Sequence, residues 1–570
     1  MPPSARPPVT LALFCPLVPQ TPSGDLATSS SSSSSSPPSL LHAGQMSGAD
    51  SSEIAEWYRG KNVFITGGTG FLGKVLVEKL LRSCPVRRIY LLMRPKRGLD
   101  INQRLEDIFN YKLFDNIKKT QPEVVQKVFA VRGDITMEGL GISDEDEARL
   151  AEEVNIVFHA AATINFQEPM RVAVNMNMLG NQESCQPCQE DERPSVAGIL
   201  YEELYPAPID PSKLIQLTEW LEDDILETLT PRLVSPRPNT YTYTKALAEH
   251  LLVSDGARLP IAIVRPSIVC GSWREPMPGW VDNLFAFTGL LVGMSKGVLR
   301  SLYIKPGITL DFIPVDFPIN LMIVSAWNTA AGRYKPSSVP IFCCSTGSQK
   351  PLTSDDLAIH LEKSLRAFPF DSPLWYPDGS AKTNKFMHQI HIYLVNILPA
   401  HIADTIMRLL GKKPIAVKLC NKMVKAVGAL EYFMLRDWVF HNTRSQCLWD
   451  SLTPVDQDEF HFDIDSLDWG EYIETYQKGC KQYIMKEDMK DLDQARRNMR
   501  KMHFLHRLLQ LVFMYGVWCV ISSESATACY SVFFRGAAKL LSLPVLAAAE
   551  EFEGEAPLEG ADVEDMSAVL

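Results

Sequence analysis

The sequence predicts an α/β fold, in which a Rossmann-type, doubly wound parallel sheet precedes a mainly helical C-terminal domain and a membrane-associated tail. Three observations predict it: a glycine-rich turn between a β-rich run and a helical pattern, a series of short apolar runs, and an apolar stretch near the C-terminus. The runs expected to form buried strands are Val63–Ile65, Ile89–Met93, Val128–Val131, Ile156–Phe158 and Ile261–Val269.

Composition excludes several classes of protein. The chain has 570 residues, of which 46% are hydrophobic and 22% charged, as in globular proteins with several domains. The net charge is −11, but Glu550–Leu570 holds eight acidic side chains and no basic one, so the other 549 residues carry only about −3. Without a basic excess, we expect no nucleic-acid partner. The twelve cysteines are scattered and are interpreted as reduced thiols.

The N-terminal segment is expected to be disordered over residues 1–50. Ser29–Ser36 is an unbroken serine run, and such a segment cannot bury enough apolar surface to offset its ordering entropy. Leu11–Val18 is apolar, but proline interrupts it, and a signal peptide favours a longer run. Met46 is a possible alternative start.

The glycine turn has the spacing Gly67-x-x-Gly70-x-x-Gly73, directly after a predicted strand and before a predicted helix. In this context glycines let the backbone approach a pyrophosphate, and the helix N-terminus offers free N–H groups to its charge. The alternative is a plain glycine turn between two core elements. The turn residues expected to bind cofactor are Thr66, Gly67, Gly70, Phe71, Leu72 and Gly73.

The predicted second strand ends at Arg94, with Lys96 and Arg97 behind it. The end of this strand meets the adenosine ribose in a Rossmann unit, and a basic cluster there suits the 2′-phosphate of NADP. A solvated charge run is the alternative. Gly133-Asp134-Ile135 forms a small turn where an adenine fits, and the alanines after His159 permit a close approach of cofactor to backbone. His159 itself is interpreted as a packed histidine, and no metal site is expected.

Tyr241 and Lys245 are the predicted catalytic pair. Asn239 can cap a helix in which these two residues, four apart, share one face. A nearby ammonium favours the phenolate and so brings the phenol into the range useful for donating a proton to a carbonyl oxygen. Tyr243 points elsewhere on the helix and is interpreted as structural. The strand after this helix ends in a loop suited to the nicotinamide.

These residues resemble the extended short-chain dehydrogenase/reductase superfamily and, within it, the fatty acyl-CoA reductases. The narrower resemblance rests also on Tyr205-Pro206-Ala207-Pro208, Val264–Ser267 and, in the C-terminal region, Leu409–Pro414 and Leu430–Phe433. It implies reduction of long-chain acyl-CoA to a fatty alcohol with two NADPH, through a bound aldehyde and with release of CoA. It implies cofactor contacts from the glycine turn and from Arg94, Asp134, Ile135, Ala161, Asn177, Lys245, Pro266, Ile268 and Val269.

One interval departs from the resembled family. The family has a strand between Asn177-x-x-Gly180 and the Tyr-Pro-Ala-Pro stretch, and a serine after it holds the substrate carbonyl. Here the interval 181–194 has no apolar run of strand length, and Ser184 and Ser195 are its nearest serines. Cys185-x-x-Cys188 has no partner pair and is not interpreted as a zinc or redox site. One central strand is therefore expected to be missing.

Four functions are weighed. The first is a membrane-attached, NADPH-dependent fatty acyl-CoA reductase. The second is an impaired or inactive member, from a deletion or a splice form, that keeps cofactor or lipid binding. A reductase of sterols or other small alcohols is disfavoured by the region after residue 380, and a purely structural protein by the Tyr241 and Lys245 pair.

The C-terminal end is expected to attach to a membrane. Leu508–Ile521 is fourteen residues without a charge, shorter than the roughly 20 of a full span. Tyr530–Ala549 is apolar but interrupted, so a hairpin, a single span and a buried helix all remain open. Basic residues before the run keep the catalytic portion in the cytosol, on a peroxisomal or endoplasmic reticulum membrane. The predicted domains are 1–50 (disordered), 51–370 (NADP-binding), 371–500 (family C-terminal domain), 501–549 (membrane-associated) and 550–570 (acidic tail).

Overall fold

The computed structural model describes residues 10–14, 51–96, 98–179, 199–255, 259–332 and 339–522. The chain forms two compact units. Unit 1 contains the residues up to Val281 together with Lys305–Ala358 and Glu431–Gly479, and unit 2 contains Asp282–Ile304, Ile359–Leu430 and the residues from Cys480 onward. The domain boundaries expected from the sequence, after residues 50, 370, 500 and 549, remain predictions. Each unit is assembled from separate stretches of the chain, because strand pairing brings distant segments together within it.

Unit 1 is built on a seven-stranded sheet with the order β12-β7-β1-β5-β2-β3-β4, in which every pair is parallel. The side chains of β2 and β7 are buried along the whole strand, as expected for parallel strands covered on both faces. The strands in chain order are β1 (Thr10–Phe14), β2 (Asn62–Thr66), β3 (Arg88–Met93), β4 (Val128–Arg132), β5 (Ile156–His159), β7 (Ile261–Pro266) and β12 (Ile341–Cys344). The predicted doubly wound fold is confirmed.

The N-terminal strand β1 corrects two predictions. Its backbone lies between β5 and β7, with Leu11 opposite Val157 on one side and Ile261 on the other. Disorder throughout residues 1–50 is therefore wrong for Thr10–Phe14. The central position is not empty either, since the N-terminal segment fills it. The interval 181–198, to which the missing strand was assigned, lies outside the described residues.

The predicted strand Ile261–Val269 is also divided. β7 ends at Pro266, and β8 (Ile268–Cys270) leaves the main sheet to pair in parallel with β11 (Phe312–Pro314). The loop residues predicted to face the nicotinamide thus begin at the carboxyl end of β7 and continue into a separate strand pair.

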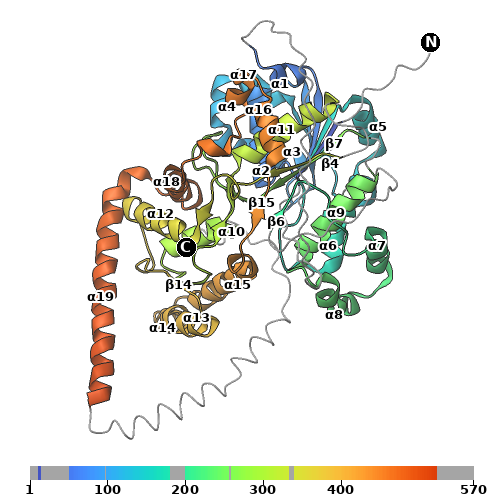
Figure 1. Cartoon of the computed structure of the whole chain (residues 1–570). Helices are drawn as coiled ribbons and strands as arrows, with labels where there is room; N and C mark the ends of the chain where they lie inside the picture. Colours follow the sequence, from blue (N-terminus) through green and yellow to red (C-terminus); the bar gives the residue numbers. More distant parts are fainter. Residues whose placement is uncertain are drawn as a thin grey trace, which may run out of the picture. The chain divides into compact units, whose positions relative to one another are not determined.

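Helices cover both faces of the sheet (Figure 1). On one face lie α2 (Phe71–Ser83) and the buried α11 (Asp316–Ala330), and on the other lie α5 (Asp144–Glu153), α6 (Met170–Asn177) and α9 (Thr240–Asp255). The remaining helices of unit 1 are α1 (Glu53–Trp57), α3 (Ile101–Phe109), α4 (Asp115–Thr120), α7 (Pro211–Trp220), α8 (Asp223–Val234), α16 (Thr443–Asp450), α17 (Pro454–Glu459) and α18 (Trp469–Gly479).

Two smaller strand pairs complete unit 1. β6 (Ile199–Leu200) pairs with β15 (Val439–Phe440), where Leu200, Tyr205, Trp438 and Phe440 form a small core. β10 (Thr309–Leu310) pairs antiparallel with β13 (Leu352–Thr353). The first of these pairs explains why part of the predicted C-terminal domain belongs to unit 1.

Unit 2 is mainly helical. Its only strand pair among the described residues is β9 (Ser301–Tyr303) with β14 (Ser380–Lys382). The fully buried ammonium of Lys481 contacts the carboxylates of Asp371 and Glu487, and Lys296 also reaches Glu487 at 3.2 Å. The helices are α10 (Ala286–Ser295), α13 (Lys385–Ile392), α14 (Leu398–Leu409) and α19 (Leu492–Ser522), while α12 (Ser354–Ala367) and α15 (Ala416–Met434) extend across the unit boundaries.

Candidate active site

The glycine turn lies where β2 ends and α2 begins. Gly67 has φ +74°, and a Cβ on it would lie 2.7 Å from the backbone of Ala160 and Ala161 after β5. A Cβ on Gly73 would overlap the carbonyl oxygen of Gly67. Both positions therefore require glycine, because backbone packs directly on backbone. The strand order changes direction at β2 and β5, which is where ligands bind in open α/β sheets.

The N-terminus of α2 is available to an anion. The helix has 13 residues, its N-cap is Gly70, and no side chain accepts a hydrogen bond from its first turn. Gly70 N–H donates to the Gly67 carbonyl at 2.9 Å, which closes the turn. Free N–H groups, the helix dipole and the absence of bulky side chains at the turn fit a dinucleotide pyrophosphate. Thr66, Gly67, Gly70, Phe71, Leu72 and Gly73 would hold it.

Helix α9 positions the predicted catalytic pair. The prediction that Asn239 caps this helix is confirmed, since its Oδ1 accepts the Thr242 N–H at 2.9 Å. Tyr241 and Lys245 are 6% and 3% exposed, and Lys245 is close enough to His159 to lower the pKa of that imidazole. Lys245 therefore lies toward the carboxyl end of β5. Tyr243 packs instead in a core with Val174, Met178 and Leu247, as its structural interpretation requires.

Asn177 joins α6 to α9. Its side chain is fully buried, its Oδ1 accepts the Thr163 N–H at 3.1 Å, and its Nδ2 donates to Thr244 Oγ1 at 3.0 Å. Thr244 is adjacent to Lys245 in the chain. Asn177 is predicted from the family resemblance to contact the cofactor, and its hydrogen bonds fix the helix that carries the predicted catalytic pair.

Arg94 lies at the carboxyl end of β3, and its guanidinium is 3.3 Å from the Asp134 carboxylate after β4. The Arg94 side chain remains 53% exposed, so it is accessible to a cofactor. Burial opposes ionisation of Asp134, but hydrogen bonds from Thr136 and the contact with Arg94 outweigh it and lower the pKa of the carboxyl. The structure thus brings together the two residues predicted to surround the adenosine. Ile135, which follows Asp134, is buried.

His159 is a packed histidine, as predicted. Its Nδ1 lies 2.9 Å from Thr66 Oγ1 at the end of β2. Burial and the charge of Lys245 lower its pKa to about 3, so the imidazole is neutral at pH 7. Within the described ranges, no group of three or more His, Cys, Asp or Glu side chains is placed to hold a metal ion.

Phe166 packs on Tyr241 and links it to Phe433. The Phe166 ring lies 5.6 Å from the Tyr241 ring and 5.8 Å from the Phe433 ring, all between centroids. Phe71 in the glycine turn stacks on Trp280 at 5.3 Å. The ring of Tyr241 thus has an aromatic neighbour, and such a contact suits a site that binds an apolar substrate.

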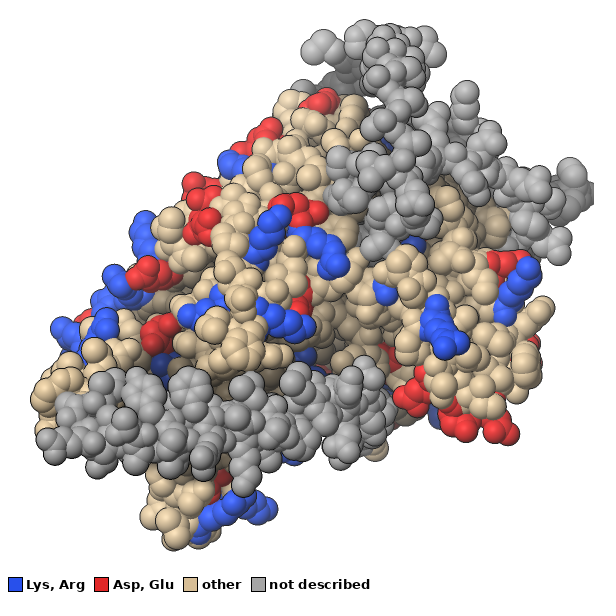
Figure 2. All heavy atoms as spheres, turned by 60° about the horizontal axis from the view of Figure 1, so that its bottom comes forward, with Lys and Arg blue, Asp and Glu red and all other residues tan. Residues whose placement is uncertain are grey.

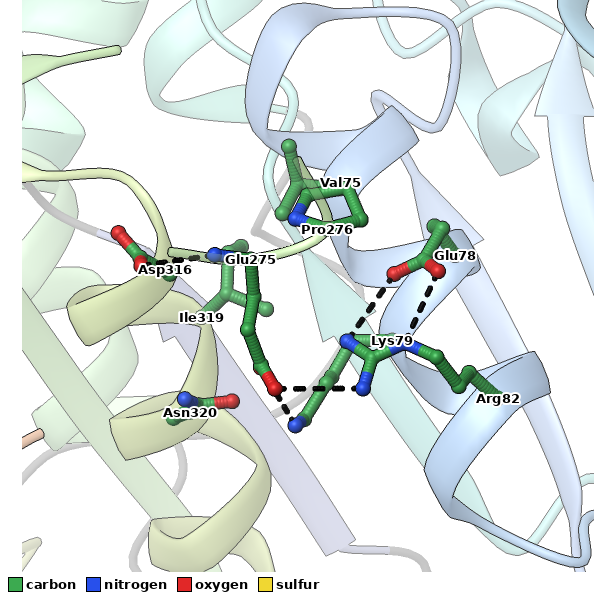
Figure 3. Close-up of a pocket in the computed structure, with 9 residues that line it drawn as sticks. All are labelled: Val75, Glu78, Lys79, Arg82, Glu275, Pro276, Asp316, Ile319 and Asn320. Carbon is green, nitrogen blue, oxygen red and sulfur yellow. Dashed lines mark hydrogen bonds and ion pairs between the residues drawn. The ribbon is translucent and has the colours of Figure 1, made fainter. Parts of the chain in front are cut away.

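A pocket lies beside α2, on its side toward α11, and is lined by charges (Figure 3). The Lys79 ammonium is 2.6 Å from the Glu275 carboxylate and donates to the Glu459 carbonyl at 2.5 Å. Arg82 contacts Glu78 at 3.0 Å and Glu275 at 3.2 Å. Asp316 accepts the backbone N–H groups of Trp273, Arg274 and Glu275. These charges satisfy one another, so the cluster fixes α2 rather than forming a second binding site.

The comparisons with known proteins agree with this geometry. An NAD-binding family model described as Male sterility protein matches residues 65–322, and a second model with that description, Sterile, matches 395–487. Fatty acyl-CoA reductase 1 of Gallus gallus and of Homo sapiens are each 36% identical over 488 residues, covering 83% of this chain and 94% of theirs. Fatty acyl-CoA reductase 2 of Mus musculus is 37% identical over 498 residues, covering 85% and 96%.

The chain belongs to the fatty acyl-CoA reductase family. The resemblance inferred from the sequence is thereby confirmed, and the NAD-binding model identifies the cofactor class as a nicotinamide dinucleotide. Among solved structures, the terminal R domain of the myxalamid PKS-NRPS pathway has a TM-score of 0.48 and 19% identity, covering 75% of this chain and 94% of that one.

Within this family member, the structure gathers most predicted site residues around the carboxyl ends of β2, β3, β4, β5 and β7. Ile268 and Val269 lie on β8, the strand that follows β7 in the chain. Sequence reasoning missed Phe166, Phe433 and Thr244, as well as the charged cluster around Lys79. The phenylalanines come from a loop and from a helix 267 positions later, and no local pattern relates them.

Proposed function

We propose that the chain reduces long-chain fatty acyl-CoA with NADPH, forming a fatty alcohol through a bound aldehyde and releasing CoA. The observation that supports the proposal most is the position of Tyr241 and Lys245 on α9, fixed by Asn177 beside a glycine turn that fits a dinucleotide. The curated relatives named fatty acyl-CoA reductase support the substrate class.

The residues of the site account for the proton transfers. A bound reduced nicotinamide supplies the hydride. Tyr241 donates a proton to the thioester carbonyl oxygen while the carbonyl carbon accepts the hydride, which gives a hemithioacetal. The hemithioacetal then loses the CoA thiol to give the aldehyde. In a second round Tyr241 protonates the aldehyde oxygen, giving the alcohol. The Lys245 ammonium stabilises the phenolate left after each transfer.

Arg94 supports NADPH as the cofactor. A guanidinium at the end of the second strand of the Rossmann unit suits a 2′-phosphate. Although Arg94 contacts Asp134, half of its side chain remains exposed and can meet the phosphate.

The test is a direct assay of the purified full chain. NADPH oxidation with palmitoyl-CoA should depend on both substrates and should yield the fatty alcohol. Tyr241→Phe and Lys245→Met should each lower kcat by at least about a hundredfold. Tyr243→Phe on the same helix is the matched control and should retain activity. Turnover that is equal in Tyr241→Phe and Tyr243→Phe would overturn the assignment.

A second candidate function is that of an impaired member which keeps cofactor or lipid binding. The sequence interval 181–198 favours it, since it has no counterpart to the carbonyl-holding serine, and loss of one such donor costs about 10²–10³ in rate. Inserting a family-like strand with its serine after Gly180, in a chain that starts at Met46, tests this candidate. Turnover of acyl-CoA that is orders of magnitude higher than in the same chain without the insertion would establish that the present chain is impaired. Equal turnover with and without the insertion would reject this candidate.

We also propose attachment to a membrane of the peroxisome or endoplasmic reticulum, with the catalytic portion in the cytosol. In the described part of the predicted segment 501–549, α19 exposes Phe504, Leu508, Phe513 and Trp518. The rest of that segment and the acidic tail lie outside the described residues. A chain ending near Arg500 should leave the membrane fraction, whereas a full chain recovered wholly in the soluble fraction would refute attachment through this segment.

A further inference from the structure

Helices α13 and α14 in unit 2 turn an apolar face outward. They form a continuous helical stretch, Lys385–Leu409, that is long and apolar enough to cross a membrane. Large apolar side chains recur along it every few residues, each between 40% and 81% exposed; they are Phe386, Met387, Ile390, Tyr393, Leu394, Leu398, Ile402, Ile406 and Leu409. A helix on the surface of a soluble domain has the opposite arrangement, with its apolar face inward.

The inward side of the same stretch buries three polar side chains besides Ile392. His388, Asn396 and Asp404 are each less than 10% exposed. His388 Nδ1 is 3.0 Å from Ser301 Oγ, and Asn396 Nδ2 donates to the Val298 carbonyl. The Asp404 carboxylate accepts the Ala416 and Val417 N–H groups at 2.8 and 3.1 Å, where α15 begins.

These inward contacts indicate that the stretch lies along a membrane surface instead of crossing it. A transmembrane position would break the bonds of His388, Asn396 and Asp404 and would leave their polar groups in hydrocarbon. A helix that keeps these contacts can present only its outer face to lipid, as interfacial helices do.

The charge around this face matches an anionic surface. Between Gly379 and Leu430 the chain has eight Lys and Arg residues and a single acid, Asp404, although the whole chain has a net charge of −11. Lys385, Arg408, Lys412, Lys413 and Lys418 are exposed at the two ends of the apolar row and on the segment after it. Figure 2 turns the lower part of Figure 1 toward the viewer and shows lysine and arginine side chains in blue and acidic side chains in red, both scattered among uncharged ones.

We propose that the outer face of α13 and α14 docks on an anionic phospholipid bilayer, with its apolar row at the boundary between headgroups and acyl chains. Basic side chains beside the row would meet lipid phosphates and carboxylates, each adding attraction at the surface. This contact is separate from the proposed attachment through Leu508–Ala549 and does not depend on reductase activity.

The experiment uses the full chain with single environment-sensitive fluorophores. One fluorophore is attached at Ile402→Cys on the proposed face. The matched control carries it at Ile359→Cys, an exposed isoleucine of α12 in the same unit. The fluorescence of the parent chain after the same labelling reaction is subtracted from both. Both proteins are bound to phosphatidylcholine vesicles with and without phosphatidylserine, some containing nitroxide-labelled acyl chains. Because only the local environment of the label is read, attachment through the C-terminal segment does not mask the result.

We expect the emission of the label at position 402 to shift to the blue when the protein binds vesicles. Quenching of this label by the acyl-chain nitroxides should be at least threefold stronger than quenching of the label at position 359. Phosphatidylserine should increase that difference, and Lys412→Glu combined with Lys413→Glu should reduce it. A label at position 402 that stays in water on vesicle-bound protein would overturn the proposal. So would a concentration-dependent dimer that Ile402→Glu abolishes, since that result assigns the face to a second copy of the chain.

Discussion

Leu13 of β1 lies opposite His159 of β5 in the parallel register of the central sheet, although 146 positions separate the two residues in the chain. The same strand pairs with β7 on its other side. A segment from the serine-rich N-terminus thus borders the strand that ends at the candidate active site.

A chain that starts at Met46 should therefore be less stable than the full chain. It lacks β1, and β5 and β7 lose the neighbour they share. At roughly 0.5–1.5 kcal/mol for each net hydrogen bond, we expect a loss of about 3 kcal/mol or more in the free energy of unfolding, measured by denaturant titration. Ala12→Pro, which removes one ladder N–H, should have a smaller effect of the same sign. Equal stability of the full and shortened chains would show that β1 does not belong to the folded sheet.

The Lys79–Glu275 pair should be worth far more than an exposed ion pair. Lys79→Met leaves Glu275 with a single cationic partner and the Glu459 carbonyl without its donor. We expect a loss of about 3–5 kcal/mol in unfolding free energy. Lys478→Met is the matched control, because Lys478 contacts Glu474 at 2.7 Å with both side chains more than a third exposed; its cost should stay below about 1 kcal/mol. Similar costs for the two variants would refute the role given to the buried cluster.

Sequence patterns predicted the parts of the fold that depend on neighbouring residues. The glycine turn, the Asn239 cap and the buried runs that form β2 to β5 each follow from a few consecutive side chains. They also separated Tyr241 from Tyr243, since a helical wheel separates residues two positions apart, and the packing of Tyr243 in a core is confirmed.

What the sequence did not predict depends on partners far along the chain. β1 is short, proline-flanked and followed by a serine run, so only its fit between β5 and β7 identifies it as a strand. Lys79 and Glu275 belong to separate elements and look like ordinary surface charges in isolation. For the stretch Lys385–Leu409, the periodicity reveals two faces but not that the one with Asn396 and Asp404 is turned inward.

Asn177 should act as a positioning residue for α9. Asn177→Ala removes the donor to Thr244 Oγ1 and the acceptor for Thr163 N–H, at a cost of about 1–3 kcal/mol in stability. The loss of alignment should also lower kcat more than it raises KM. Asn177→Asp keeps the acceptor and should recover part of kcat. If both variants keep wild-type kcat at a temperature where they are folded, Asn177 is only structural.

Arg94 should determine the choice between the two nicotinamide cofactors. Arg94→Ala removes a charged contact to the 2′-phosphate, and the ratio of kcat/KM for NADPH over NADH should fall about ten- to a hundredfold. Arg149→Ala is the control, since Arg149 is also half exposed and contacts an aspartate, Asp146, at 2.6 Å. A cofactor ratio unchanged by Arg94→Ala would refute the assignment of NADPH.

His159 should make the folded protein sensitive to acid. Burial and the Lys245 charge lower the pKa of His159 from 6.5 to about 3. Between pH 6.5 and pH 3, His159 is therefore protonated in the unfolded chain but neutral in the folded chain. The contribution of His159 to the free energy of unfolding is then fully present above about pH 6.5 and is lost progressively as the pH drops from 6.5 toward 3. His159→Gln, which can still meet Thr66, should flatten this part of the pH profile of unfolding free energy, whereas replacing the exposed His401 by Gln should not. Parallel profiles for His159→Gln and the parent protein would mean that His159 is not the buried neutral group that the geometry indicates.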